Sequence, residues 1–126
     1  MNEDWSDREV ELIIADYFAM LADEIKGIKF NKTRHRSQLL LLLDKRSNSA
    51  VEFKHRNISA VLGDMGLPFI KGYLPSYHFQ GSKLIPKISK YLQLNSALEK
   101  DFADFSNNIP ETKKSIEWDS LIVSPP

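Results

Sequence analysis

The N-terminal segment carries the pattern that most constrains the fold of this chain. Ser6 is followed by Glu9 at the spacing of a capping box, which predicts that a helix begins at Asp7. Apolar side chains then recur with the helical period of roughly 3.6 residues until Gly27, a typical stop signal. This apolar face consists of Val10, Ile13, Ile14, Tyr17, Phe18, Leu21 and Ile25. We therefore expect a long amphipathic helix at the start of a mainly α-helical domain.

A second helix is predicted over 32–45. Asn31 or Thr33 would cap its start, and the run Leu39–Leu43 supplies an apolar face wide enough to touch two neighbouring elements. A short apolar run also suits a buried strand, because it has no diagnostic period of its own. Helix and strand are therefore both open for residues 39–54.

A third helix is predicted over 50–65. Ser49 and Glu52 repeat the capping-box spacing after a turn-forming Ser-Asn pair, and Gly66 supplies the stop signal. Phe53 projects away from the apolar face of this helix. We therefore expect the aromatic segment that follows the helix to cover the Phe53 ring.

The rest of the chain is predicted to form a loop, two shorter helices and a tail. Segment 67–80 contains two prolines, a glycine and four aromatic residues, and we expect an ordered loop or a short hairpin there. Helical periodicity covers 83–92, and a further capping box opens a helix over 96–105. The polar composition and prolines of 107–126 are typical of a tail or linker, which leaves 1–106 as one helical domain.

Composition limits the class of protein. The chain has 126 residues, of which 42% are apolar, and this suffices for one core. It has no cysteine and three histidines, so we expect no disulfide, no metal centre and no cofactor. The longest apolar run is far shorter than the ~20 residues of a membrane span, and the acidic N-terminus does not resemble a signal peptide. We expect a soluble cytoplasmic protein without a membrane partner.

Charge is distributed unevenly, although the seventeen basic and seventeen acidic residues cancel. Residues 1–28 contain eight acidic and two basic residues, and residues 29–60 contain eight basic and two acidic residues. A basic segment of this kind occurs both on nucleic-acid-binding surfaces and on ordinary solvated faces.

The order of these signals resembles the Myb/SANT family of trihelical DNA-binding units. A Trp-Ser-x-x-Glu start precedes the first helix, and a Leu-x-x-Arg-Ser turn precedes the third. The matching positions are Trp5, Ser6, Glu9, Leu43, Arg46, Ser47, Val51, Lys54, Asn57 and Ile58. The resemblance implies a helix-turn-helix arrangement that recognises DNA with its third helix.

A longer stretch, from Trp5 to Gln80, is similar to the N-terminal region of some bacterial restriction-type, HNH-endonuclease-associated proteins. The similar stretch includes Phe53–Leu62 and the Gly72-Tyr73-x-Pro75 motif. In that family a helical module precedes a nuclease or another effector domain. The resemblance implies a non-catalytic module for duplex DNA recognition in restriction or phage defence, with a C-terminal effector domain as its partner.

A helix that enters the major groove presents a polar face to the bases and buries its other face. On the predicted third helix, Arg56 would reach guanine edges, Glu52 would accept from cytosine, and Ser59 would touch a base or a phosphate. Phosphate contacts at the helix start are expected from Lys45, Arg46, Ser47, Asn48 and Ser49. The positive surface would be extended by Lys32, Arg34, Arg36 and Lys54.

A metal-dependent nuclease is an alternative. Asp44 and the Glu52-x-Lys54 pair, placed on two strands, would form an Asp…Glu-x-Lys site in which the carboxylates hold Mg²⁺ and the lysine stabilises the reacting charge. This interpretation requires that the segment around these residues be extended and not helical.

A protein-interaction module is a further alternative. The acidic first helix or the aromatic segment 67–80 would then bind a protein partner. This interpretation is favoured if the acidic helix is found to cover the basic segment.

Overall fold

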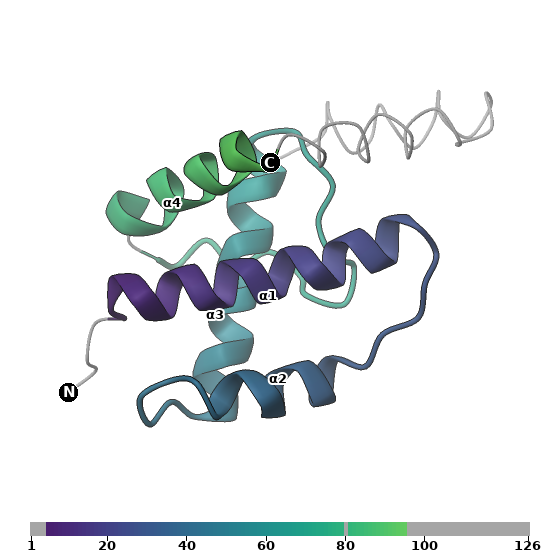
Figure 1. Cartoon of the computed structure of the whole chain (residues 1–126). Coiled ribbons are helices and arrows are strands. Elements are labelled where there is room, and N and C mark those ends of the chain that lie inside the picture. Colours follow the sequence, from purple (N-terminus) through teal and green to yellow (C-terminus); the bar gives the residue numbers. More distant parts are fainter. Residues whose placement is uncertain (1–4, 80, 96–126) are drawn as a thin grey trace.

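The first helix, α1, spans Asp7–Ile25 and begins at the predicted capping box. Ser6 Oγ accepts a hydrogen bond from the Glu9 amide at 3.1 Å, and Glu9 Oε1 accepts one from the Ser6 amide at 3.0 Å. The helix ends where Gly27 adopts a left-handed φ of +74°, a conformation that glycine adopts without strain. The computed structural model describes residues 5–79 and 81–95 of the chain (Figure 1).

Helix α2 spans Lys32–Leu40 and is shorter than predicted. Asn31 caps it, because its side-chain oxygen accepts a hydrogen bond from the Arg34 amide at 3.0 Å. The leucine run does not continue the helix or form a strand: Leu41 is 85% exposed and follows the last helical residue. The strand alternative for 39–54 is therefore wrong.

Helix α3 spans Asn48–Asp64, so the predicted third helix is confirmed but begins two residues early. Its N-cap is Ser47, whose Oγ accepts a hydrogen bond from the Ala50 amide at 3.0 Å. The predicted Ser49 capping box is wrong, because Ser49 already lies inside the helix. Gly66, with φ +73°, follows the end of the helix as predicted.

Helix α4 spans Gly81–Leu94, which contains the predicted segment 83–92 and extends beyond both of its ends. The segment between α3 and α4 is an ordered loop over its described residues, without a hairpin. The mainly α-helical fold class is thus confirmed for residues 5–79 and 81–95, in which no strand occurs. The predicted helix over 96–105 and the tail over 107–126 lie outside the described residues.

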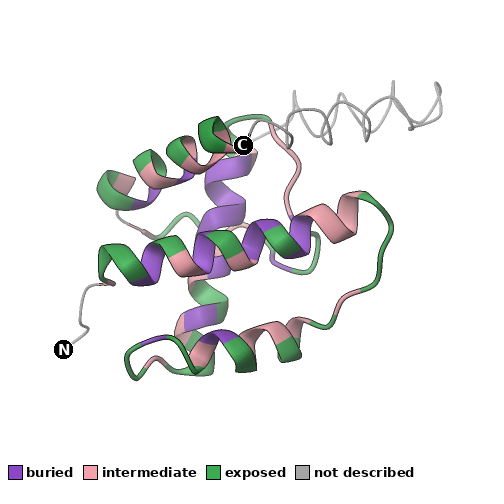
Figure 2. Cartoon of the chain, in the orientation of Figure 1, coloured by how far each residue is buried: buried purple, intermediate pink, exposed green. Residues whose placement is uncertain are grey.

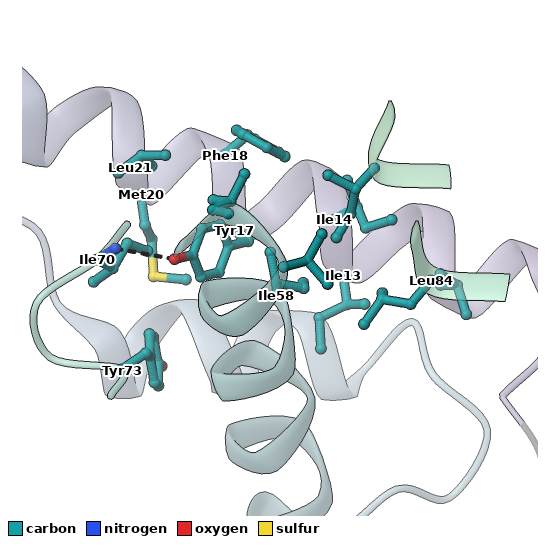
Figure 3. Close-up of a cluster of buried hydrophobic side chains, with 14 of the residues drawn as sticks. Ile13, Ile14, Tyr17, Phe18, Met20, Leu21, Ile58, Ile70, Tyr73 and Leu84 are labelled. Carbon is teal, nitrogen blue, oxygen red and sulfur yellow. Dashed lines mark hydrogen bonds between the residues drawn. The ribbon is translucent and has the colours of Figure 1, made fainter. Parts of the chain in front are cut away.

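Helix α3 lies at the centre of the described domain. Helix α1 crosses it, and α1 also contacts α2 and α4 on its two sides (Figure 1). Six successive α3 residues, Asn57–Leu62, are buried, so this part of the helix is covered on every side (Figure 2). The main core lies between α1 and α3, where Ile13 and Tyr17 meet Ile58 (Figure 3).

The loop between α3 and α4 is held by specific hydrogen bonds. The Ile70 amide donates to the hydroxyl of Tyr17 at 2.9 Å (Figure 3). Asn57 Nδ2 donates to the Ser76 carbonyl at 2.8 Å, and the Ser76 amide donates to the Arg56 carbonyl at 3.1 Å. The loop therefore forms part of the packed domain. Among the described helices, none is both long and apolar enough to cross a membrane.

Candidate nucleic-acid interface

The turn between α2 and α3 is anchored to α1 by a buried ion pair. Arg46 donates from Nε to Glu9 Oε2 at 3.0 Å and from Nη2 to Glu9 Oε1 at 2.7 Å. Glu9 is 1% exposed and also accepts a hydrogen bond from the Asp44 amide at 3.0 Å. The hydrogen bond from Arg46 lowers the pKa of Glu9 to about 2.

Arg46 therefore has a structural role that the sequence did not reveal. Besides the ion pair, its guanidinium lies 4.9 Å from the centre of the Trp5 ring. A phosphate contact by Arg46, as predicted, would have to share the guanidinium with Glu9. The ion pair holds the turn immediately before α3 against α1. The first residues of α3, which follow this turn, face solvent.

The exposed end of α3 carries most of the remaining predicted phosphate ligands. Lys45, Asn48 and Ser49 are exposed there, and Ser47 Oγ is engaged in capping the helix. The partial positive charge of a helix N-terminus attracts phosphate. Lys45 lies in the turn between α2 and α3, and its backbone adopts a left-handed φ of +53°.

The three predicted base-reading residues differ in their exposure to solvent. Glu52 is exposed on the second turn of α3. Arg56 is half-buried, and its Nε donates to the Leu74 carbonyl at 2.9 Å. Ser59 is wholly buried, with its Oγ 2.7 Å from the Tyr17 hydroxyl, so its predicted outward position is wrong. Because Asn57–Leu62 is buried, α3 is accessible at its first turns and at its last residues, Gly63 and Asp64, and the exposed predicted DNA ligands lie at the first turns.

Lysine and arginine occur three times in α2, and these three residues are not equally exposed. Arg34 is exposed and Arg36 is half-buried. Lys32 is turned toward the loop between α3 and α4, where its Nζ donates to the Gly72 carbonyl at 2.8 Å and lies 4.4 Å from the centre of the Tyr73 ring. Arg34 is thus the member of this group best placed for a ligand.

A groove of about 840 Å³ lies beside the first turns of α3. We call it the aromatic groove; its aromatic and basic lining residues are Trp5, Phe53, His78, Phe79, Arg46, Lys54 and Lys83. Phe53 is 41% exposed within it, so the predicted covering of this ring by the following loop is wrong, although the helix prediction at Phe53 is right. The sequence could not reveal the groove, because four separate segments meet to form it.

A carboxylate between two histidines links the first three helices. Asp16 of α1 lies 2.8 Å from His35 Nδ1 and 3.2 Å from His55 Nε2. His55 is fully buried, and its burial lowers its pKa below the ordinary value even though the Asp16 carboxylate opposes that shift. This arrangement fixes the packing of α2 and α3 on α1.

The nuclease alternative required a metal site on two strands. Asp44 lies in the turn before α3, whereas Glu52 and Lys54 lie on the helix itself. Within residues 5–79 and 81–95, no group of three or more histidine, aspartate or glutamate side chains is placed to hold a metal ion. The strand geometry on which this alternative depended is therefore wrong.

No family model matches the chain, and neither the curated proteins nor the solved structures with which it was compared contain a significant match. The resemblance to Myb/SANT units and to restriction-type proteins therefore stays a prediction. The arrangement of the four described helices and the placement of individual side chains are the observations from which function is inferred.

Proposed function

We propose that this domain binds duplex DNA through the turn between α2 and α3 and the first two turns of α3. The observation that carries the proposal is the solvent exposure of Asn48, Ser49 and Glu52 on a helix whose segment Asn57–Leu62 is wholly buried. Polar side chains on a rigidly held helix end are the arrangement with which helix-turn-helix proteins contact base edges and phosphates.

Charge supports the same proposal. The described residues contain fourteen lysines and arginines against nine aspartates and glutamates, so this part of the chain is basic although the whole chain is neutral. Lys45 is exposed just before α3, and Arg34 is exposed on α2. Lysine and arginine contacts to phosphate supply most of the sequence-independent affinity for DNA.

The family resemblance supplies the biological setting. In this proposal the domain is the recognition module of a bacterial restriction or phage-defence protein, and a nuclease or other effector domain acts with it. The Myb-like, helix-turn-helix character of α1–α3 belongs to the same proposal. In helix-turn-helix proteins the connection is usually a turn of about 3–4 residues, and here the longer segment between Leu40 and Asn48 is held in place by the Glu9–Arg46 pair.

Fluorescence anisotropy of a labelled, randomised duplex at two salt concentrations tests the proposal. Binding should weaken steeply with salt, because phosphate-bound counterions are released. Lys45→Gln should reduce the slope of log K against log salt by about 0.9, the value for one lost phosphate contact. Lys26→Gln is the matched control, because Lys26 is also an exposed lysine. It follows the C-terminal end of α1, whereas the turn before α3 contacts Glu9 near the N-terminal end of α1.

The outcomes separate the candidate functions. An equal loss of slope in both variants would show nonspecific attraction and not a contact at α3. With Mg²⁺ present, electrophoresis of the recovered DNA checks for cleavage, which would revive the nuclease alternative. Absence of binding at low salt would contradict the proposal.

A protein-interaction module is the second candidate, and one observation favours it. The acidic helix α1 does cover part of the basic segment: Glu9 holds Arg46, and Asp16 holds His35. Two adjacent leucines, Leu41 and Leu42, are also 85% and 50% exposed after α2. Lys45→Gln would then leave partner binding unchanged, whereas a Leu41→Asp variant would weaken it.

A further inference from the structure

The aromatic groove lies where three helices begin. Trp5 precedes α1, Phe53 and Lys54 lie on the second turn of α3, and Lys83 lies on the first turn of α4. His78 and Phe79 close it from the loop before α4. The volume of about 840 Å³ is within the range of ligand-binding clefts, which is about 300–1,000 Å³.

Aromatic side chains form its walls. The Phe53 ring is 41% exposed, although Val51, Ile58, Val61 and Leu62 of the same helix are buried. Phe79 and His78 come from the loop on the other side of the groove. Planar rings that line a groove at this degree of exposure offer stacking surfaces, and nucleic-acid bases stack on such rings irrespective of their sequence.

Asn57 supplies a buried acceptor. It is 1% exposed, lines the groove, and donates from Nδ2 to the Ser76 carbonyl at 2.8 Å. Its Oδ1 is buried and accepts a hydrogen bond from none of the described residues. A buried amide oxygen without a donor is costly and uncommon. A ligand N–H group would satisfy it once the side chains that cover it move aside.

The charge of the lining favours an anion. Lys54 and Lys83 line the groove, and no aspartate or glutamate is among the described residues that line it. Arg46 lines it too, but its charge is paired with Glu9. Lys83 Nζ donates to the Trp5 carbonyl at 2.9 Å and lies 3.3 Å from Asp7 Oδ1, and its side chain is still 44% exposed. A ligand that is planar, carries N–H donors and is negatively charged fits these three features together.

We propose that the aromatic groove binds one unpaired nucleotide of DNA. The base lies between Phe53 and Phe79, one of its N–H groups donates to Asn57 Oδ1, and the adjoining phosphate lies near Lys54 and Lys83. A base can lie between two aromatic rings only after it has left the stack of the duplex, so the groove accepts a base only when that base is unpaired. The inference rests on the proposed DNA binding, because the groove adjoins the first turns of α3.

The test compares three duplexes of one sequence in anisotropy titrations: fully paired, with a single bulged adenosine, and with a bulged abasic residue. We expect the bulged adenosine duplex to bind about 5- to 100-fold more tightly than the paired duplex, the range for one base stacked on an aromatic ring. The abasic bulge has the same flexible backbone without a base, and should bind like the paired duplex. Titration with free dAMP distinguishes a base within DNA from a free nucleotide.

Two variants locate the effect. Phe53→Ala should abolish the preference for the bulged adenosine, so that the bulged and the paired duplex bind this variant with equal affinity. Tyr77→Ala is the matched control, because Tyr77 is a 55% exposed aromatic residue of the same loop that does not line the groove. Thermal unfolding curves establish that both variants are folded.

Each outcome decides between the two proposals. Equal binding of all three duplexes would overturn the nucleotide site and leave the proposed duplex binding intact. A preference that survives Phe53→Ala, or that the abasic bulge shares, would also overturn it. Tight binding of dAMP that Phe53→Ala removes would support the site with a free nucleotide as its source, and lack of binding to every ligand would overturn both proposals.

Discussion

The two halves of α3 belong to one continuous helix but have opposite environments. From Asn57 to Leu62 the helix is surrounded by α1, α4 and the following loop, whereas Asn48, Ser49 and Glu52 face solvent. The buried half positions the exposed half, and the Glu9–Arg46 pair holds the point where the exposed half begins. The difference shows that the accessible part of the candidate recognition helix is short and rigidly mounted.

The largest expected effect on stability comes from breaking the Glu9–Arg46 pair, which anchors the exposed half of α3. Arg46→Ala leaves the Glu9 carboxylate buried without its partner, and removing one member of a buried pair costs about 3–5 kcal/mol. The free energy of unfolding, measured by urea denaturation, should fall by this amount. Arg34→Ala, at an exposed position of α2, should change it by less than about 0.5 kcal/mol. A similar small loss for Arg46→Ala would contradict the anchoring role.

The next effect separates the two halves of α3 directly. Ile58→Ala removes a fully buried core side chain and should lower the free energy of unfolding by about 2–5 kcal/mol. Phe53→Ala, in the exposed half, removes a larger side chain but should cost much less, because its ring is 41% exposed. Equal losses in the two variants, measured in the same denaturant series, would show that the halves are packed alike.

Acid should weaken the anchor in a defined pH window. The pKa of Glu9 is lowered from its ordinary value of 4.5 to about 2, so its stabilising contribution is present above pH 4.5 and is lost as pH falls through about 2. The lost contribution is about 3 kcal/mol, from the size of the pKa shift. The free energy of unfolding, measured from pH 5 to pH 2, should fall more steeply for the wild type than for Glu9→Gln. Parallel curves would contradict the lowered pKa.

The smallest effect concerns the first turn of the exposed half. Ser47→Ala removes the side-chain cap on the Ala50 amide and should cost about 0.5–2 kcal/mol. The same change at Ser49, one residue into the helix, should cost less, since Ser49 does not cap it. Amide hydrogen exchange of the first turn checks the assignment, because Ser47→Ala should speed exchange there and leave Asn57–Leu62 protected.

Local signals explain which parts of the fold could be predicted from the sequence. The start of α1 and the glycine stops after α1 and α3 depend on neighbouring residues only, and they are confirmed. The start of α3 was predicted at the wrong serine, because Ser47 and Ser49 both precede helical residues and only the folded backbone shows that Ser47 is the cap. The local sequence therefore predicts the presence of a helix more reliably than it predicts the first residue of that helix.

The candidate site depended on contacts between distant residues, which the sequence does not show. The sequence predicts Ser59 on the outward side of α3 together with Glu52 and Arg56, but this part of α3 is covered on every side, and Ser59 meets Tyr17 of α1. Arg46 likewise looks like a surface cation until Glu9, far away in the chain, is found beside it. The exposed ends of α3 were predictable, and the buried partners were not.

The most direct test of the central claim is an NMR titration of ¹⁵N-labelled protein with a DNA duplex. If the exposed half of α3 is the contact surface, the largest amide shift changes should fall on Lys45, on the residues from Asn48 to Phe53 and on Arg34, with little change from Asn57 to Leu62. Shift changes confined to α1 or to the far end of α4, with none at the beginning of α3, would contradict the account.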